Sequence, residues 1–144
     1  MTIVFDMDNT LTDEFGSTLR PGIVSLLKRL ETEGHTLKLW TNSKRNRAVE
    51  ILRTHVLMSF FVECVYRENY DPQELGLSKD IRKIKGDLLI DDDPNEIEYA
   101  RSSGRRACLI RSYRKGHQGD NEELRRLYEV IRKKHGLIRR LLGK

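Results

Sequence analysis

Short apolar runs alternate with amphipathic stretches along most of the chain. Five mainly apolar runs predict buried strands, at residues 2–5, 36–40, 60–66, 87–90 and 107–110. Between these runs, apolar side chains recur every three or four residues, which is the period of a helix that buries one face. The clearest helical stripe lies between Pro21 and Gly34 and consists of Ile23, Val24, Leu26, Leu27 and Leu30.

Capping and helix-breaking residues place the other helices. A helix is expected after Ser43, which can cap it. A helical region over residues 71–85, with a break expected at Gly76, begins at an Asp-Pro pair. A further helix is expected over residues 94–103. The last helix is expected from about Asp120, which forms a capping-box pattern with Glu123. Because strands alternate with helices, we predict an α/β protein with a three-layer, Rossmann-like fold and a mainly parallel five-stranded sheet.

No internal repeat, low-complexity stretch or linker divides the chain, so residues 1–144 are expected to form one domain with a basic C-terminal helix. Hydrophobic residues make up 38% of the sequence, which is enough for a core at this length. No run approaches the roughly 18 apolar residues of a membrane span. Asp6 and Asp8 stand where a signal peptide would be basic or apolar, so a cytoplasmic protein is expected.

The cysteines and histidines form no recognisable metal-binding pattern. Cys64 and Cys108 lie in apolar runs without a CxxC spacing, and the four histidines form no HExxH motif. We therefore expect no zinc site, and we expect both cysteines to be small core residues.

Charge is distributed unevenly along the chain. Residues 1–100 hold 13 Lys and Arg against 18 Asp and Glu, whereas residues 101–144 hold 14 Lys and Arg against 4 Asp and Glu. A basic C-terminal region of this kind can bind an anionic partner such as nucleic acid. The alternative is that these residues form the solvated face of a helix, and the sequence leaves both interpretations open.

Polar side chains follow three of the predicted strands. Asp6 and Asp8 come after the first strand, Thr41 and Asn42 after the second, and residues 91–93, all aspartates, after the fourth. In open α/β sheets, ligands bind outside the carboxyl ends of the strands. The three groups are therefore expected to converge on one edge of the sheet.

Carboxylates gathered in this way need a cation to offset their mutual repulsion. All-oxygen ligands suit Mg²⁺, which keeps bound waters and accepts oxygens of a substrate phosphate. A carboxylate beside such a site can attack phosphorus, and a second can protonate the leaving oxygen and then activate water. A hydroxyl and an ammonium group would stabilise the transferred phosphoryl group.

The stretch DMDNT, residues 6–10, resembles the DxDx[TV] signature of the haloacid dehalogenase superfamily, whose members are mostly Mg²⁺-dependent phosphatases. The resemblance covers about residues 2–110. It implies that Asp6 is the nucleophile and Asp8 the general acid and base. It also implies a hydroxyl that binds phosphate at Thr41, in LWTNS, and a lysine at Lys79, in LSKDIRKI.

The resemblance implies the metal ligands as well. In LLIDDDP, Asp91 and Asp92 match the acidic pair that holds the metal together with Asp6 and the backbone carbonyl of Asp8. The longer stretch KDIRKIKGDLLIDDDP is similar to small phosphatases of the carboxy-terminal-domain type. A carboxylate at Asp8 implies phosphomonoester hydrolysis, because the dehalogenase and ATPase branches have another residue there.

Some assignments have local alternatives. Lys83 and Lys85 are neighbours that could replace Lys79, and Asp93 could simply cap the helix that follows it. Asn42 could bind the phosphate or only hold its loop. A calcium-binding loop is excluded because Thr10 and Leu11 stand where Asp or Asn and Gly would be needed.

No segment is long enough for the cap domain that covers the site in many superfamily members. Residues 11–20 offer only a local flap, with Gly16 as a possible hinge. An open site of this kind suits a phosphate on a large molecule, such as a protein or a nucleic acid end. Two functions remain: a Mg²⁺-dependent phosphomonoesterase with a phosphorylated substrate, or a module that binds phosphate or nucleic acid through its basic C-terminal region.

Overall fold

The computed structural model describes residues 1–116 and 121–143 and contains a five-stranded parallel sheet at its centre. Along the sheet the strands lie in the order β3-β2-β1-β4-β5, and each strand is parallel to its neighbours. The strands are β1 (Thr2–Phe5), β2 (Thr36–Trp40), β3 (Cys64–Val65), β4 (Leu88–Asp91) and β5 (Arg106–Leu109). The predicted fold class is confirmed.

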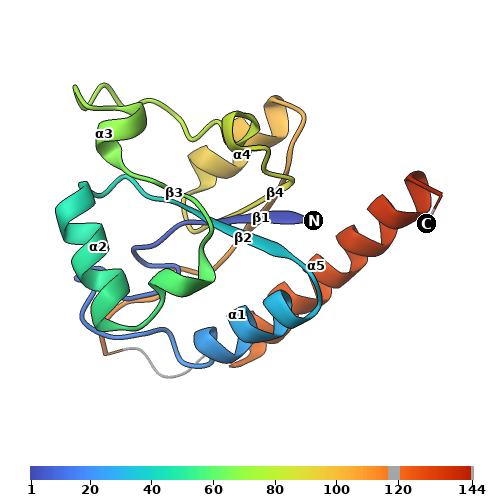
Figure 1. Ribbon diagram of the computed structural model, residues 1–144, viewed down its shortest axis with the longest axis horizontal. Helices are drawn as coiled ribbons and strands as arrows, with labels where there is room; N and C mark the ends of the chain where they lie inside the picture. The colour runs from blue at the N-terminus through green and yellow to red at the C-terminus, as the bar shows by residue number, and fades with distance from the viewer. Residues whose placement is uncertain (117–120, 144) are drawn as a thin grey trace.

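Helices cover both faces of the sheet, which gives the three layers visible in Figure 1. One face packs against α1 (Ile23–Thr32), α2 (Arg45–Thr54), the 3₁₀ turn η1 (Met58–Phe60) and α5 (Asn121–Leu141). The other face packs against α3 (Arg67–Tyr70), the 3₁₀ turn η2 (Ile81–Ile84) and α4 (Pro94–Ser102). None of the helices in the described residues is long and apolar enough to cross a bilayer.

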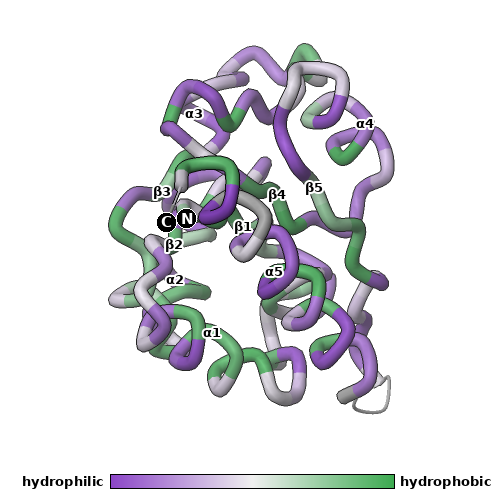
Figure 2. Tube along the Cα trace, turned by 90° about the vertical axis from the view of Figure 1, so that its right-hand side faces the viewer, coloured by the Kyte–Doolittle hydropathy of each residue, from purple (hydrophilic) through white to green (hydrophobic). Residues whose placement is uncertain are grey.

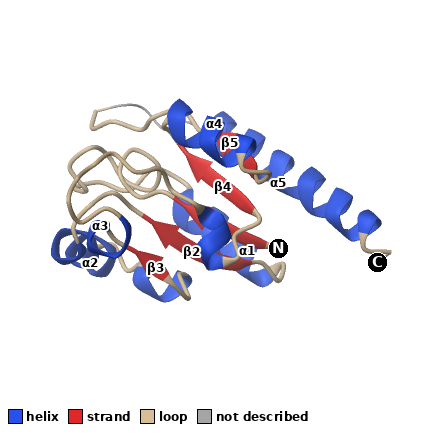
Figure 3. Ribbon diagram, turned by 90° about the horizontal axis from the view of Figure 1, so that it is seen from above, coloured by secondary structure: helices blue, strands red, loops and turns tan. Residues whose placement is uncertain are grey.

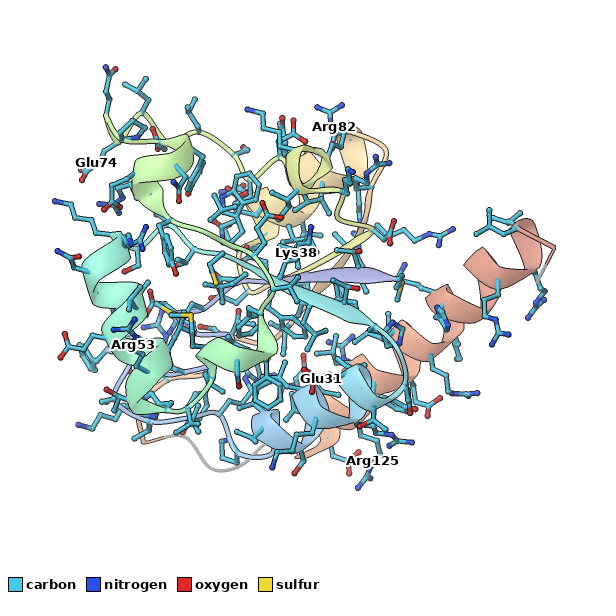
Figure 4. All side chains as sticks on the ribbon, in the orientation of Figure 1. Glu31, Lys38, Arg53, Glu74, Arg82 and Arg125 are labelled. Carbon is cyan, nitrogen blue, oxygen red and sulfur yellow. The ribbon has the colours of Figure 1, made fainter. Side chains whose placement is uncertain are left out.

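Alternation of side chains along the strands builds two separate cores. Ile3 and Phe5 point to the face covered by α1 and α5, whereas Val4 points to the face covered by α4. The apolar segments of the trace coincide with the strands and the inner sides of the helices in Figure 2. Lys38, the one charged residue inside β2, extends along the second face and donates to the carbonyl of Ile84 at 2.8 Å (Figure 4). The same ammonium group forms an ion pair with Glu63 at 2.9 Å, which neutralises its charge.

Two predicted elements differ from the structure. The third strand was expected over residues 60–66 but spans only Cys64–Val65, because η1 runs to Phe60 and both Phe60 and Phe61 pack into the same core, whereas consecutive strand residues point to opposite faces. Residues 71–80, expected to be helical, form an irregular loop instead. The Asp71 carboxylate accepts backbone N–H groups of residues 75–77, and Glu74 and Gly76 have positive φ, so a helix cannot continue.

The ends of the other helices are close to those expected. Ser43 does not cap α2: Lys44 is the N-cap residue and its side chain makes no capping hydrogen bond, whereas the Glu68 carboxylate accepts the backbone N–H of Arg45 at 3.0 Å. Asp93 does cap α4, because its carboxylate accepts the backbone N–H of Asn95 at 2.9 Å. Asp120, the expected start of the last helix, lies outside the described residues. The helix α5 runs past the amino ends of the strands and away from their carboxyl ends (Figures 1 and 3).

Candidate active site

The polar residues that follow β1, β2 and β4 meet at the carboxyl edge of the sheet, which Figure 3 shows as the side to which the arrowheads point. They line one open cavity of about 800 Å³. Its lining includes all the residues for which the sequence predicted a role, namely Asp6, Asp8, Thr41, Asn42, Lys79, Asp91 and Asp92. Residues from four separate parts of the chain thus share one site.

Lys79 lies at the centre of the carboxylates. Its Nζ atom is 2.8 Å from Asp6 Oδ1 and 2.8 Å from Asp91 Oδ2, and only 4% of the residue is exposed. Burial alone would lower the pKa of Lys79, but the two carboxylates raise it well above its usual range. Lys83 and Lys85 are exposed, so of the three candidate lysines Lys79 is the one that lies in the site.

Asp6, Asp91 and Asp92 offer carboxylate oxygens that all lie within 4.8 Å of one another. Burial and the charge of Asp6 raise the pKa of Asp91 to about 8 and that of Asp92 to about 6. With all three carboxylates ionised, the one ammonium group leaves the site with a net negative charge, and the raised pKa values of Asp91 and Asp92 reflect burial and this repulsion. The donor set therefore fits a hard divalent cation.

A hydroxyl group fixes the orientation of Asp6. Thr10, which is fully buried, donates from Oγ1 to Asp6 Oδ2 at 2.9 Å. The backbone turns sharply between the two residues, with Asn9 at φ 64° and the N–H groups of Thr10 and Leu11 both bonded to the carbonyl of Met7. Thr10 received no role from the sequence, although it is the fifth position of DxDx[TV], which is the signal that could have indicated one.

Asp8 has a different environment from Asp6. Its two carboxylate oxygens accept hydrogen bonds from the guanidinium of Arg47 at 2.8 and 2.9 Å, and Arg47 also donates to Ser43 Oγ at 3.0 Å. Sequence reasoning missed Arg47. The only available signal was its position one helical turn after Ser43, which places it on the side of α2 that faces the site.

The residues after β2 keep donors available for a ligand. Thr41 Oγ1 accepts the N–H of Ser43 at 3.0 Å, so the Thr41 hydroxyl proton can point into the cavity. The side-chain oxygen of Asn42 accepts two hydrogen bonds from Arg67, at 3.1 and 2.9 Å. The Asn42 amide nitrogen therefore points away from Arg67. Asn42 holds its loop through the side-chain oxygen and can donate to a ligand through the nitrogen.

Comparison with known proteins identifies the family. The sequence matches the model described as NLI interacting factor-like phosphatase over residues 1–138. The chain belongs to this family. It is a phosphatase, and the cavity at the carboxyl edge of the sheet is its candidate active site. A search of curated protein sequences gave no significant match.

Solved structures similar to this phosphatase share its fold. The D,D-heptose 1,7-bisphosphate phosphatase from B. bronchiseptica, complexed with magnesium and phosphate, has a TM-score of 0.66 and 13% identity, over 92% of this chain and 98% of that chain. A hydrolase from Streptococcus pneumoniae TIGR4 has a TM-score of 0.62 and 16% identity, over 77% and 92%. A chain of the Pnkp1/Rnl/Hen1 complex has a TM-score of 0.58 and 15% identity, over 83% and 46%.

The loop expected as a flap over the phosphatase site is fastened to the protein. Asp13 is fully buried and accepts hydrogen bonds from Phe15, Ser17 and Thr18, at 2.6 to 3.1 Å. Burial would raise the pKa of Asp13, but these hydrogen bonds lower it well below its usual range. The carbonyl of Gly16 is hydrogen-bonded to the His55 ring at 2.8 Å, which ties the loop to the end of α2, and a Cβ at Gly16 would collide with Ile51. The described residues therefore contain neither a cap domain nor a loose flap.

Proposed function

We propose that this phosphatase is a Mg²⁺-dependent phosphomonoester hydrolase that forms an aspartyl-phosphate on Asp6. The observation that carries the proposal is the setting of Asp6, which is held between Lys79 and Thr10 beside two further carboxylates. A nucleophilic carboxylate must be ionised and aimed at phosphorus. A buried ammonium on one oxygen and a hydroxyl on the other favour both conditions.

Magnesium would be held by Asp6, Asp91 and Asp92, together with the backbone carbonyl of Asp8 that the superfamily resemblance implies. A bound Mg²⁺ would supply positive charge that lets an anionic phosphate approach an anionic nucleophile. Two facts support this choice of metal: the donors are all oxygens, and the B. bronchiseptica phosphatase of similar fold is complexed with magnesium and phosphate.

The protein groups would act in two steps. In the first, an oxygen of Asp6 attacks phosphorus, the bond from phosphorus to the leaving oxygen breaks, and Asp8 gives its proton to that oxygen. In the second, Asp8 takes a proton from water as the water attacks phosphorus, the Asp6–phosphorus bond breaks, and inorganic phosphate is released. Thr41, Lys79 and the Asn42 amide would donate hydrogen bonds to the phosphoryl oxygens.

The open cavity supports a substrate whose phosphate projects from a large molecule. The cavity of about 800 Å³ has no cover among the described residues, and the exposed apolar residues Phe15, Leu75 and Leu77 come from loops at the carboxyl ends of the strands. A small sugar phosphate would leave these side chains in water. A macromolecular substrate can cover them.

The test compares Asp6→Asn with Glu98→Gln, an exposed change of the same kind outside the cavity. With p-nitrophenyl phosphate, Asp6→Asn is expected to lose turnover by at least about a thousandfold, while Glu98→Gln keeps the wild-type rate. Chelation should abolish wild-type activity, and added Mg²⁺ should restore it and raise the melting temperature. Near-normal turnover by Asp6→Asn would show that another group is the nucleophile.

A further inference from the structure

A second groove adjoins the active-site cavity along β5, the edge strand of the sheet. It has a volume of about 690 Å³ and lies between β5, the end of α4 and α5. Asp92 lines both this groove and the active-site cavity, so the two adjoin at this residue. Four basic residues line the groove, namely Arg101, Arg111, Arg126 and Lys134. We call this feature the basic groove.

The charge of the two cavities differs in sign. The active-site cavity is lined by eight acidic residues and four basic ones, whereas the basic groove is lined by Asp92, Glu123 and the four basic residues. A polyanion with one end at Asp6 is therefore repelled by most of the active-site wall. It is attracted on the side that leads past Asp92 along β5, where basic residues outnumber acidic ones.

The cations of the basic groove fall into two kinds. Arg101 and Arg126 are fixed: each donates to an edge carbonyl of β5, Arg101 to Ala107 and Arg126 to Leu109, both at 3.0 Å. Arg111 and Lys134 form no side-chain hydrogen bond or ion pair in the part of the chain that the structure describes. The fixed pair shapes the groove, and the other two can each bind an anion.

These contacts also select against a peptide ligand. A peptide that extends a sheet bonds to the free carbonyls and N–H groups of the edge strand. Arginine side chains already occupy the carbonyls of Ala107 and Leu109. Guanidinium groups retain further donors that suit phosphate oxygens. The groove is therefore better suited to phosphodiesters than to an added strand.

We propose that the basic groove binds single-stranded nucleic acid whose terminal phosphate enters the active site. The proposal rests on the proposed phosphatase function, because it names the substrate class of the same site. A single strand can bend at Asp92, which allows its end to reach the buried Asp6 while the following phosphates lie along Arg111 and Lys134. The affinity is then expected to be strongly salt-dependent.

The test uses a fluorescent single-stranded octanucleotide, with a 5′-phosphate in one arm and a 3′-phosphate in another, and Asp6→Asn protein in Mg²⁺ to prevent turnover. Binding is measured by anisotropy at several salt concentrations. The groove variant Arg111→Gln/Lys134→Gln is compared with Arg125→Gln/Lys133→Gln, which removes the same charge from α5 outside the groove. Arg125 lies on the outer side of α5 in Figure 4.

The groove variant is expected to weaken binding on the order of tenfold at 0.1 M salt and to reduce the log–log salt slope by about 1.4, which corresponds to two lost phosphate contacts. The control variant should weaken binding less than about twofold. Both variants in the otherwise wild-type protein should hydrolyse p-nitrophenyl phosphate at the wild-type rate, since neither changes the active site.

Three results would overturn the inference: equal losses in both variants, no binding of either oligonucleotide, or tighter binding of an acidic peptide of equal charge. The last result would indicate a phosphoprotein partner. Failure of the proposed function is a separate outcome. If p-nitrophenyl phosphate is not hydrolysed although the groove variant alone loses oligonucleotide binding, the groove is a binding site and the catalytic proposal is wrong.

Discussion

Lys79 and Asp6, which lie 73 positions apart in the sequence, are joined by a hydrogen bond of 2.8 Å in a place that solvent barely reaches. The same ammonium group bonds Asp91, so one cation holds the ends of β1 and β4 together from the loop before η2. The contact that would orient the nucleophile is thus also a structural link between the two central strands.

Lys79→Met is therefore expected to destabilise the protein by about 3–5 kcal/mol, because two buried carboxylates lose their partner. The measurement is urea unfolding with a chelator present. Lys83→Met, an exposed change, should stay within about 0.5 kcal/mol of wild type. Adding Asp91→Asn to Lys79→Met should restore part of the loss, since one unpaired charge is then removed. Equal stability of both lysine variants would contradict the prediction.

Asp92 gives the metal-free protein a defined pH dependence. Burial and the nearby Asp6 raise the pKa of Asp92 from its ordinary value of 3.8 to about 6. The folded state then binds a proton more tightly than the unfolded state, so this contribution to stability is present below pH 4 and lost as the pH rises through 6. In chelator, Asp92→Asn should flatten the fall in melting temperature between pH 4 and 7, while Glu98→Gln should not. If the melting temperatures of the two variants fall in parallel between pH 4 and 7, the raised pKa of Asp92 is contradicted.

Asp8 is expected to matter most for poor leaving groups. Asp8→Asn removes the proton donor but leaves Asp6 and its partners in place, so alkyl phosphates should lose roughly 10²–10⁴ in kcat/KM. p-Nitrophenyl phosphate needs little proton donation and should lose less than about tenfold. The comparison requires only steady-state kinetics on the two substrates. Equal losses on the two substrates would mean that Asp8 positions the metal or the loop and does not protonate the leaving oxygen.

Arg20 is expected to stabilise the loop that follows β1. It is 1% exposed and donates to the backbone carbonyls of Thr10 at 2.8 Å, Asn9 at 3.0 Å and Arg111. Arg20→Met would leave buried carbonyls without these donors and should cost on the order of 3 kcal/mol in urea unfolding. Arg82→Met, a change at an exposed arginine labelled in Figure 4, is the matched control. If both changes lower the free energy of unfolding by a similar small amount, the loop after β1 keeps its conformation without Arg20.

The fold and the location of the site follow from the sequence, because both depend on local patterns. The apolar runs at residues 2–5 and 36–40 correspond to β1 and β2, and the polar residues at strand ends meet because parallel strands place their carboxyl ends together. The roles of Asp6 and Asp8 rest on the motif and remain predictions. The length of β3 and the loop at residues 71–80 could not be predicted, since the packing of Phe60 and Phe61 into one core and the Asp71 turn override the local preference.

Tertiary structure alone decided which distant side chains meet. Three lysines lie within seven residues of one another, and only packing shows that Lys79 is enclosed between Asp6 and Asp91. The sequence likewise did not show that Arg47 bonds to Asp8, or that Arg101 and Arg126 bond to carbonyls of β5. The physical reason is that apolar periodicity reflects burial near each residue in the chain, whereas an ion pair depends on how separate elements pack, which no local pattern records.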